Sequence, residues 1–334
     1  MKKKILLIAT GGTIASAEGA DGLAPSLSGE DLTACVPELR DLCDLAVLQL
    51  MNLDSSNVRP RHWLAMSRAI AERYADYDGF VLTHGTDTMS YTAAALSYLI
   101  QQSAKPIVLT GSQLPMTAPL TDARKNLCES VLYAADDASC DVSVVFDGIA
   151  IAGTRARKQR TRSLHAFESV NFPPLARIGN GRIARMLPPP DFSPGQLRIF
   201  DRLNERVFAL KLLPSTTAHI FPLLEADYDA VVLESFGIGG IPDEDGSFER
   251  AIRRWTASGR LLAVTTQVPE EGCDLRVYEV GSKYHGQPGI LETGTMTPEA
   301  AAAKLMWAMA QNTAPAPLFH HPINFDLSIQ PCGK

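Results

Sequence analysis

Short runs of aliphatic and β-branched residues alternate with helix-length segments along the first 150 residues of the chain. This order is typical of parallel strands that are joined by helical crossovers. The apolar runs are continuous rather than alternating, which indicates that both faces of the sheet are covered. We therefore predict a doubly wound α/β unit with strands at residues 3–10, 45–53, 79–83, 107–110 and 142–146, and helices at 60–74, 90–100 and 121–135.

A proline-rich stretch from Pro188 to Gly195 separates this unit from a second one. Such a stretch continues neither a helix nor a central strand, and its stiffness suits a linker. A length of 334 residues is also closer to two domains than to one. We predict an N-terminal α/β domain at 1–188, a linker at 189–205 and a smaller, parallel α/β domain at 206–334. The second domain is expected to have strands at 207–212, 230–235 and 261–266, and helices at 216–224, 247–258 and 298–309.

Composition and charge exclude several classes of protein. With 31 Lys and Arg against 37 Asp and Glu, the net charge is −6, so binding to nucleic acid through bulk charge is not expected. No apolar run reaches the 18 or so residues of a membrane span, and the apolar start breaks at Gly11 and Gly12, before the core of a signal peptide is complete. The six cysteines show no Cys-x-x-Cys spacing. We expect a cytoplasmic protein with reduced thiols, no metal and no membrane partner.

Four polar loops follow predicted strands, at the ends where a doubly wound sheet forms its ligand crevice. The glycines of the first loop allow tight turns, but the pattern is neither that of a P-loop nor a clean G-x-G-x-x-G, so phosphate or dinucleotide binding is not supported. Each loop by itself is compatible with an ordinary turn or helix cap. Together they indicate one crevice, built from Thr10–Ala15, Asp54–Asn57, Thr83–Thr88 and Thr110–Gln113.

The loop after the third predicted strand is more polar than a helix cap requires, because Thr86 and Thr88 flank Asp87. A threonine beside a carboxylate and an amine can take part in a proton relay. A candidate amine is Lys158, which lies in the basic run 155–162. The other cations of this run are expected to be solvated or paired with carboxylates.

These motifs, together with Phe236–Pro242, resemble the bacterial-type L-asparaginases, and the cytoplasmic type I branch most closely. The similarity runs in the same order over nearly the whole chain. It implies an asparaginase-like fold of two domains, the larger with a doubly wound sheet. It also implies an amidohydrolase that attacks the side-chain amide of asparagine with a threonine, releases ammonia and frees aspartate by hydrolysis, without a cofactor.

The resemblance also implies roles for individual residues. Thr13 matches the first nucleophilic threonine of the family, on the mobile N-terminal loop. Thr86, Asp87 and Lys158 match the second threonine with its carboxylate and its amine. Asp87 is expected to bind the α-amine of the substrate, and backbone groups from Gly111 to Gln113 are expected to bind its oxyanion. The further residues expected to bind the substrate are Ser55, Ser56, Gly85 and Ser112.

Members of the family form homodimers or tetramers in which the partner's C-terminal domain completes the site. The resemblance therefore implies self-association, with Gly239 and Gly240 near the neighbouring site. The expected small-molecule partner is an amide substrate, with no nucleic acid and no membrane. Two alternatives stay open: an enzyme that prefers glutamine or another amide, and a non-catalytic sensor of asparagine or aspartate.

The chain departs from its family at Leu23, where the N-terminal loop usually carries a tyrosine whose hydroxyl helps to activate the first threonine. A leucine has no proton to pass. If Thr13 is the nucleophile, its proton must go to a water, to the substrate or to a nearby hydroxyl such as Ser26 or Ser28.

We predict that Leu23→Tyr raises kcat for asparagine or that the native chain is slow, because general acid–base assistance typically contributes about 10²- to 10⁴-fold in rate. Steady-state ammonia release by both proteins measures the effect. If the native chain is fast and slows when tyrosine is installed, the loop closes by another arrangement, and Thr13→Ala would then decide whether Thr13 is the nucleophile.

Overall fold

The structure is a computed structural model that describes residues 2–19, 22–190, 192 and 195–327, with only the backbone described within 17–25. The chain divides into two compact units, Met1–Asp201 and Arg202–Lys334, and the division falls inside the segment expected to be a linker. Part of that segment, β14 (Arg198–Ile199), pairs with β6 (Ile100–Gln101) of the first unit.

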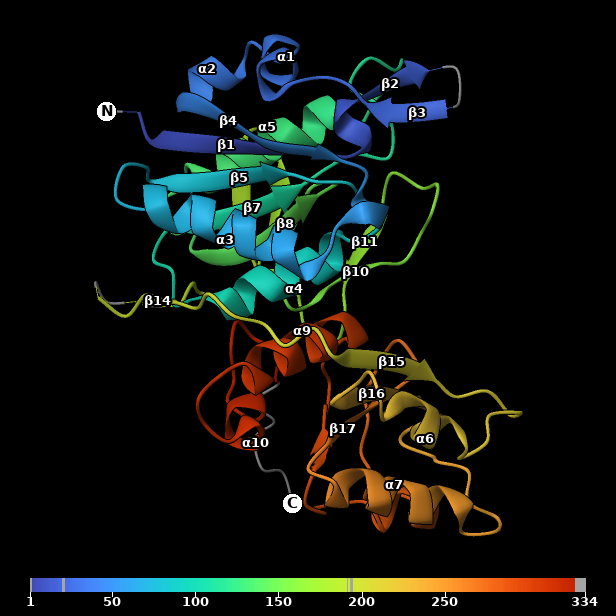
Figure 1. Cartoon of the computed structure of the whole chain (residues 1–334). Helices are drawn as coiled ribbons and strands as arrows, with labels where there is room; N and C mark the ends of the chain where they lie inside the picture. The colour runs from blue at the N-terminus through green and yellow to red at the C-terminus, as the bar shows by residue number, and fades with distance from the viewer. Residues whose placement is uncertain (1, 20–21, 191, 193–194, 328–334) are drawn as a thin grey trace. The chain divides into compact units, whose positions relative to one another are not determined.

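The first unit is built on an eight-stranded sheet with the order β13-β12-β9-β8-β7-β5-β1-β4 (Figure 1). The five strands from β8 to β4 are parallel, which confirms the predicted doubly wound α/β class. Three further strands extend the sheet in antiparallel fashion and were not predicted. The bounds are β1 Lys4–Gly11, β4 Asp44–Leu53, β5 Gly79–Thr83, β7 Pro106–Thr110, β8 Asp141–Phe146, β9 Ile149–Ala152, β12 Ala176–Gly179 and β13 Arg182–Arg185.

Helices cover both faces of this sheet. In Figure 1, α3 (Pro60–Arg73) and α4 (Met89–Leu99) lie over one face and α5 (Ala123–Ala134) over the other. The short helices α1 (Gly29–Ala34) and α2 (Leu39–Leu42) share an apolar core with α5. Every residue of the central strands β5 and β7 is buried, which explains why their sequences are apolar without alternation.

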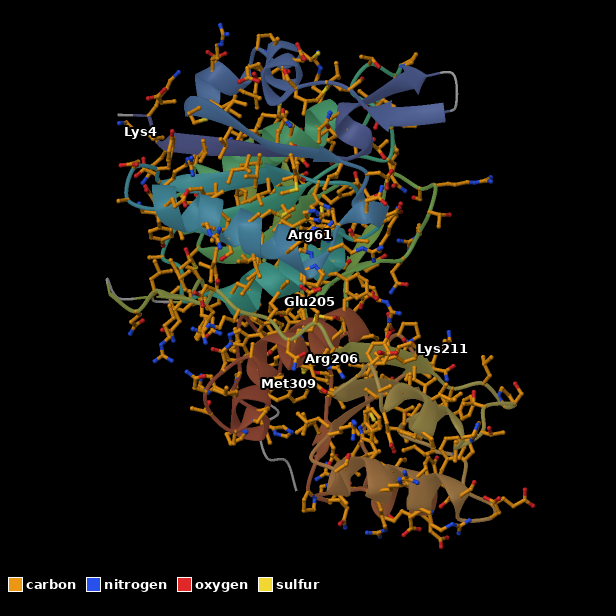
Figure 2. All side chains as sticks on the ribbon, viewed as in Figure 1. Lys4, Arg61, Glu205, Arg206, Lys211 and Met309 are labelled. Carbon is orange, nitrogen blue, oxygen red and sulfur yellow. The ribbon has the colours of Figure 1, made fainter. Side chains whose placement is uncertain are left out.

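The connections at the carboxyl edge of the parallel strands carry small elements of their own. Figure 1 shows a hairpin of β2 (Ser16–Gly19) and β3 (Gly22–Pro25), and the pair β10 (Ala156–Lys158) and β11 (Phe167–Ser169), at this edge. Two single 3₁₀ turns follow β1 and β4, at Thr13–Ala15 and Ser55–Asn57. Lys4, labelled in Figure 2, marks the opposite edge, where β1 begins.

The second unit has a four-stranded parallel sheet with the order β15-β16-β17-β18, as the predicted smaller α/β domain requires. Arg206, labelled in Figure 2, precedes its first strand and pairs with Asp229 at 3.1 Å. No helix in the described part of the chain is long and apolar enough to cross a membrane. The bounds are β15 Val207–Lys211, β16 Ala230–Ser235, β17 Leu261–Thr266, β18 Ile290–Glu292, α6 Ile220–Leu224, α7 Ser247–Ala257, α8 Glu279–Ser282, α9 Pro298–Met309 and α10 Pro315–Phe319.

A buried ion pair fastens the end of the second unit. Lys304 of α9 and Asp326 are both fully buried, and the ammonium lies 2.6 Å from the carboxylate. The same ammonium donates a hydrogen bond to the carbonyl of His321 at 2.7 Å. Burial lowers the pKa of Lys304, so the carboxylate is needed to keep this amine charged.

Candidate active site

Four loops at the carboxyl edge of the first sheet are in contact, and three of them make these contacts through a glycine backbone. A Cβ placed on Gly12 would lie 2.3 Å from the backbone nitrogen of Gly85, and one placed on Gly85 would lie 2.5 Å from Oγ of Ser55. A Cβ on Gly111 would lie 2.3 Å from the carbonyl oxygen of His84. These contacts are shorter than any side chain allows, so the loops approach closely only because these positions carry no Cβ.

The predicted threonines therefore start from neighbouring points. Thr13 follows Gly12, whose φ of +84° turns the chain from β1 into a 3₁₀ turn, and it is half-buried. Thr86 follows Gly85 and is buried. Because the two glycine backbones are in contact, the structure brings both threonine segments to the same place at the edge of the sheet.

Thr86, Asp87 and Lys158 form one hydrogen-bonded cluster. The ammonium of Lys158 donates to Oγ1 of Thr86 and to Oδ1 of Asp87, both at 2.7 Å. The lysine side chain is 16% exposed and that of Asp87 is 64% exposed, so the cluster opens to solvent at the carboxylate. Lys158 reaches the cluster from β10, where it pairs with Phe167 in the antiparallel β10–β11 ribbon.

The side chain of Gln113 belongs to the same cluster, although the sequence pointed only to the backbone at this position. Its Oε1 accepts a hydrogen bond from Oγ1 of Thr86 at 3.2 Å. Its Nε2 donates to the carbonyls of Ser163 and Arg160 at 3.1 and 3.4 Å. No local motif reports these contacts, because their partners are 27 to 50 residues away.

Asp122 holds the loop after β7, although it directly precedes α5. The neighbouring Thr121 hydroxyl accepts from the nitrogen of Ala123 at 3.1 Å. The Asp122 carboxylate makes no cap hydrogen bond and instead accepts from the nitrogens of Gln113 and Leu114 at 2.9 and 3.0 Å. Two backbone donors of a loop satisfy a carboxylate better than one cap contact does.

Asn126 and Ser112 complete this loop. Nδ2 of Asn126 donates to the carbonyl of Gly111 at 3.0 Å and to Asp122 at 3.2 Å. The hydroxyl of Ser112, which is buried, donates to the carbonyl of Leu114 at 2.5 Å. The hydroxyl of Ser112 is thus engaged within the loop, and the contacts of Asn126 and Asp122 fix the backbone from Gly111 to Leu114.

The two serines after β4 differ in exposure. Ser55 is buried against Gly85, and its carbonyl accepts from Oγ1 of Thr88 at 2.8 Å. Ser56 is exposed, and its nitrogen donates to the carboxylate of Asp54 at 2.8 Å. The turn that presents both serines is therefore tied to the loop of Thr86 through Thr88.

A chain of buried hydrogen bonds, in which each donor and acceptor can be assigned, connects the loop of Thr86 to the helices α4 and α3. Nδ1 of His84 lies 2.7 Å from the carbonyl of Gly85, which only accepts, so Nδ1 is the donor. Nε2 then accepts from Thr92 of α4 at 2.9 Å, and Thr92 accepts from Nε1 of Trp63 of α3 at 2.9 Å. Burial lowers the pKa of His84 to about 4, which keeps the imidazole neutral.

The N-terminal hairpin carries Leu23, and the side chain at this position lies outside the described residues. Ser28, one of the two hydroxyls considered as a substitute, is the N-cap of α1 and accepts from the nitrogen of Asp31 at 3.1 Å. Its hydroxyl donates to the carboxylate of Asp31 at 2.8 Å. Ser26 is exposed.

The basic run behaves differently from expectation at one position. Arg155 is fully buried, with its guanidinium 5.5 Å from the ring centre of Phe172, so the expectation of a solvated cation is wrong there. A guanidinium over an aromatic face is stabilised by the ring quadrupole. Arg160 and Arg162 are exposed, as expected, and Arg160 pairs with Glu168 at 2.8 Å.

The remaining predicted positions lie in the second unit. Gly240 bridges to Phe236 in a tight turn, and Gly239 has a φ of +141° and lies against Leu275. The cysteines with described side chains are all free thiols, and Cys332 lies outside the described residues. Within the described ranges, no group of three or more His, Cys, Asp or Glu side chains is arranged to hold a metal ion.

Chemically, the cluster at the edge of the first sheet places a hydroxyl between an ammonium and an amide, with a carboxylate beside the ammonium. Such a group can move a proton to or from a bound molecule without a metal. The fixed backbone of the Gly111 loop supplies peptide groups next to it, the kind of donor that stabilises a developing oxyanion.

Comparison with known proteins identifies both units. Residues 4–189 match the family model "Asparaginase, N-terminal", and residues 206–318 match "Glutaminase/Asparaginase C-terminal domain". An L-asparaginase from Thermococcus kodakarensis is 35% identical over 307 residues, which cover 92% of each chain. One subunit of the glutamyl-tRNA(Gln) amidotransferase from Pyrococcus furiosus is 33% identical over 320 residues, covering 91% of this chain and 72% of that protein.

Solved structures of L-asparaginases have the same fold as this chain. The thermostable L-asparaginase from Thermococcus kodakarensis superposes with a TM-score of 0.90 at 32% identity, covering 97% of this chain and 99% of that one. A probable cytoplasmic L-asparaginase from Campylobacter jejuni superposes with a TM-score of 0.81 at 26% identity, covering 95% of this chain and 98% of that one.

The glycine contacts predict that Gly85→Ala both destabilises the first unit and impairs the site. The new methyl group would lie 2.5 Å from Ser55 Oγ, and overpacking of this kind costs about 1–3 kcal/mol. Gly179→Ala is the matched control, because nothing lies within 4 Å of a Cβ at that position. Urea unfolding of both variants measures the difference. Equal stability of the two variants would contradict the close approach of the loops.

The lowered pKa of His84 should make the free energy of unfolding depend on pH. Its pKa is about 4 in the folded protein, against 6.5 for an unperturbed histidine, so the unfolded chain binds more protons between these values. Stability is therefore lost as the pH falls through this window. We expect the wild type to lose about 2 kcal/mol more than His84→Gln between about pH 7.5 and pH 5.

The comparison with His84→Gln is needed because Asp141 acts in the opposite direction. Burial raises the pKa of Asp141 to about 7, so this group stabilises the fold as the pH falls. Asp141 is present in both proteins and cancels in the difference. Unfolding free energies of the two proteins at both pH values provide the test, and parallel losses would show that His84 is not buried neutral.

Proposed function

The chain belongs to the asparaginase family, and we propose that it is an amidohydrolase that converts L-asparagine to L-aspartate and ammonia through an acyl-threonine intermediate. The observation that carries the proposal is the cluster of Lys158, Thr86 and Asp87, joined by two hydrogen bonds of 2.7 Å. The L-asparaginase from Thermococcus kodakarensis supports asparagine as the substrate.

In the proposed reaction, Oγ1 of Thr13 attacks the carbon of the side-chain amide. A C–O bond forms, the C–N bond breaks, and the proton that the hydroxyl loses leaves on ammonia. Thr86, Lys158 and Asp87 provide the relay through which that proton passes. Water then attacks the acyl ester, returns a proton to Thr13 and releases the carboxylate. Contact between the backbones of Gly12 and Gly85 supports the roles of Thr13 as nucleophile and Thr86 as part of the relay, since the segments that carry them lie side by side.

Substrate positioning is proposed for the loops around this cluster. Ser55 packs against Gly85 at the start of the loop of Thr86, Ser56 follows it in the same turn, and Asp87 is exposed enough to meet an α-ammonium group. The backbone from Gly111 to Gln113, which Asp122 and Asn126 hold in place, would face the developing oxyanion. Every one of these groups is supplied by the first unit.

Two other activities compete with asparaginase activity. A preference for glutamine or another amide is the first, and the Pyrococcus furiosus relative gives it weight, because it belongs to a glutamyl-tRNA(Gln) amidotransferase. A sensor that binds but does not hydrolyse is the second. Ammonia release from asparagine, compared with glutamine at equal concentration, separates an asparaginase from a glutaminase. A sensor is identified by binding of asparagine or aspartate without release of ammonia.

We also propose self-association and a cytoplasmic location. The glycine-rich turn of Gly239 packs against α8, since a Cβ on Gly281 would lie 3.0 Å from the Gly239 carbonyl, and three exposed apolar side chains lie near α8: Val277, Tyr278 and Val280. Apolar groups gathered in this way are typical of an interface. A location in the cytoplasm is supported by the Campylobacter jejuni relative. Light scattering of the purified chain would give its mass in solution.

The relay predicts strongly non-additive losses of activity. Thr86→Val keeps the shape of the side chain and removes the hydroxyl, and Lys158→Met removes the ammonium. Each is expected to lower kcat for asparagine by about 10²- to 10⁴-fold. The double variant should lose about as much as the worse single variant, because groups that act as a unit are not additive.

Arg162→Met is the matched control, since it removes a cation from an exposed position of the same segment. It should leave kcat within about twofold of the wild type. Losses that multiply in the double variant would argue against a shared relay. An equal loss on Arg162→Met would indicate a bulk effect of charge instead.

A further inference from the structure

The contacts of Gln113 tie two remote parts of the site together. Its side-chain oxygen accepts from the hydroxyl of Thr86, and its side-chain nitrogen donates to the carbonyls of Ser163 and Arg160. The last two belong to the connection between β10 and β11, the ribbon that delivers Lys158. Gln113 therefore bridges the threonine and the segment that carries its amine.

Chemistry fixes the orientation of this amide. Carbonyl oxygens only accept hydrogen bonds, so the NH₂ group of Gln113 must face Ser163 and Arg160. The Oε1 atom is then left facing Thr86, and an inverted amide would place oxygen against two carbonyls. The backbone nitrogen of Gln113 is held by Asp122 at 2.9 Å, which anchors the side chain at its base.

The direction of the Thr86 hydroxyl follows from these contacts. A hydroxyl has one proton and two lone pairs. Lys158 occupies one lone pair, because an ammonium only donates. Oε1 of Gln113 only accepts hydrogen bonds, so the hydroxyl proton of Thr86 must point toward it. The second lone pair of the Thr86 hydroxyl remains. Because the hydroxyl proton points toward Gln113, this lone pair is available to accept a hydrogen bond from a bound molecule.

We propose that Gln113 is a positioning residue that makes Thr86 a hydrogen-bond acceptor toward the substrate site, by holding its hydroxyl proton while Lys158 occupies the neighbouring lone pair. The inference rests on the proposed amidohydrolase function and adds a residue that is not among the expected catalytic groups. Without Gln113, the hydroxyl of Thr86 is free to rotate and to turn its proton toward the substrate site. Two donors then face each other, because the nucleophile or the amide must also donate a hydrogen bond there.

The test compares three single variants with the wild type in steady-state hydrolysis of asparagine. Gln113→Met preserves size but offers neither acceptor nor donor. Gln113→Glu keeps an oxygen for Thr86. Gln159→Met makes the same change as the first variant at an exposed glutamine of the β10–β11 connection and serves as the control.

We expect Gln113→Met to lower kcat by about 10- to 100-fold and to change KM by less than about threefold, because misorientation affects the reaction more than binding. Gln159→Met should resemble the wild type. An unchanged kcat for Gln113→Met, or a loss confined to KM, overturns the proposal.

The Gln113→Glu variant tests the orientation of the amide through the pH dependence of kcat, beside the split between kcat and KM in Gln113→Met. A neutral carboxylic acid has one acceptor and one donor and so imitates the amide, whereas a carboxylate loses the donor that faces the two carbonyls. The ratio of its kcat to that of the wild type should therefore rise as the pH is lowered toward the carboxyl pKa, about 4.3 in a free side chain. A ratio that is independent of pH and no higher than that of Gln113→Met overturns the proposal.

Hydrogen exchange separates failure of this inference from failure of the proposed function. Gln113→Met should speed exchange of the backbone amides at residues 159–164, and this can be measured whether or not the chain is active. A wild type that releases no ammonia from any amide overturns the function alone. A wild type that is active, with unchanged exchange and unchanged kcat in Gln113→Met, overturns only the role of Gln113.

Discussion

The site depends on the close approach of three backbone segments that carry no Cβ where they meet. Gly12 lies against Gly85, and Gly111 lies against the carbonyl of His84. A methyl group at any of these points would overlap neighbouring atoms by about 1 Å. Because of this packing, the residues after each glycine emerge from the same small area at the carboxyl edge of the sheet. Thr13 and Thr86 are neighbours for that reason, although 73 positions of sequence separate them.

Around this contact, the structure distributes the polar groups in two layers. Toward the interior, His84, Thr92 and Trp63 form a neutral chain of hydrogen bonds that links the strand to α4 and α3. Toward the solvent, Lys158 and Asp87 bring charge to the hydroxyl of Thr86. A neutral inner layer avoids the cost of burying an ion, and the outer layer keeps its carboxylate hydrated. The hydroxyl of Thr86 thus lies between a neutral, buried support and a charged pair that faces the solvent.

Much of this arrangement is readable from local patterns. Continuous apolar runs predicted the parallel strands, because a strand covered on both faces has no polar side. Polar residues directly after those runs predicted that their loops meet, since parallel strands end at one edge. The Asp122 carboxylate and the side chain of Gln113 were missed because their partners lie elsewhere in the chain. The burial of Arg155 was not anticipated, because a run of cations looks solvated unless the aromatic ring that covers one of them is known.

By itself, the sequence determined the α/β class, the two-unit organisation and the loops that carry Thr13, Thr86 and Asp87, because hydrophobic periodicity and glycine spacing act over a few residues. Tertiary structure alone decided that Lys158 reaches Thr86 across 72 residues and that Gln113 accepts a hydrogen bond from the hydroxyl of Thr86. It also decided that His84 is a buried support, neutral because burial lowers its pKa to about 4. Hydrogen bonds depend on distance and direction to within a few tenths of an ångström, and only the packed sheet and its loops set those quantities.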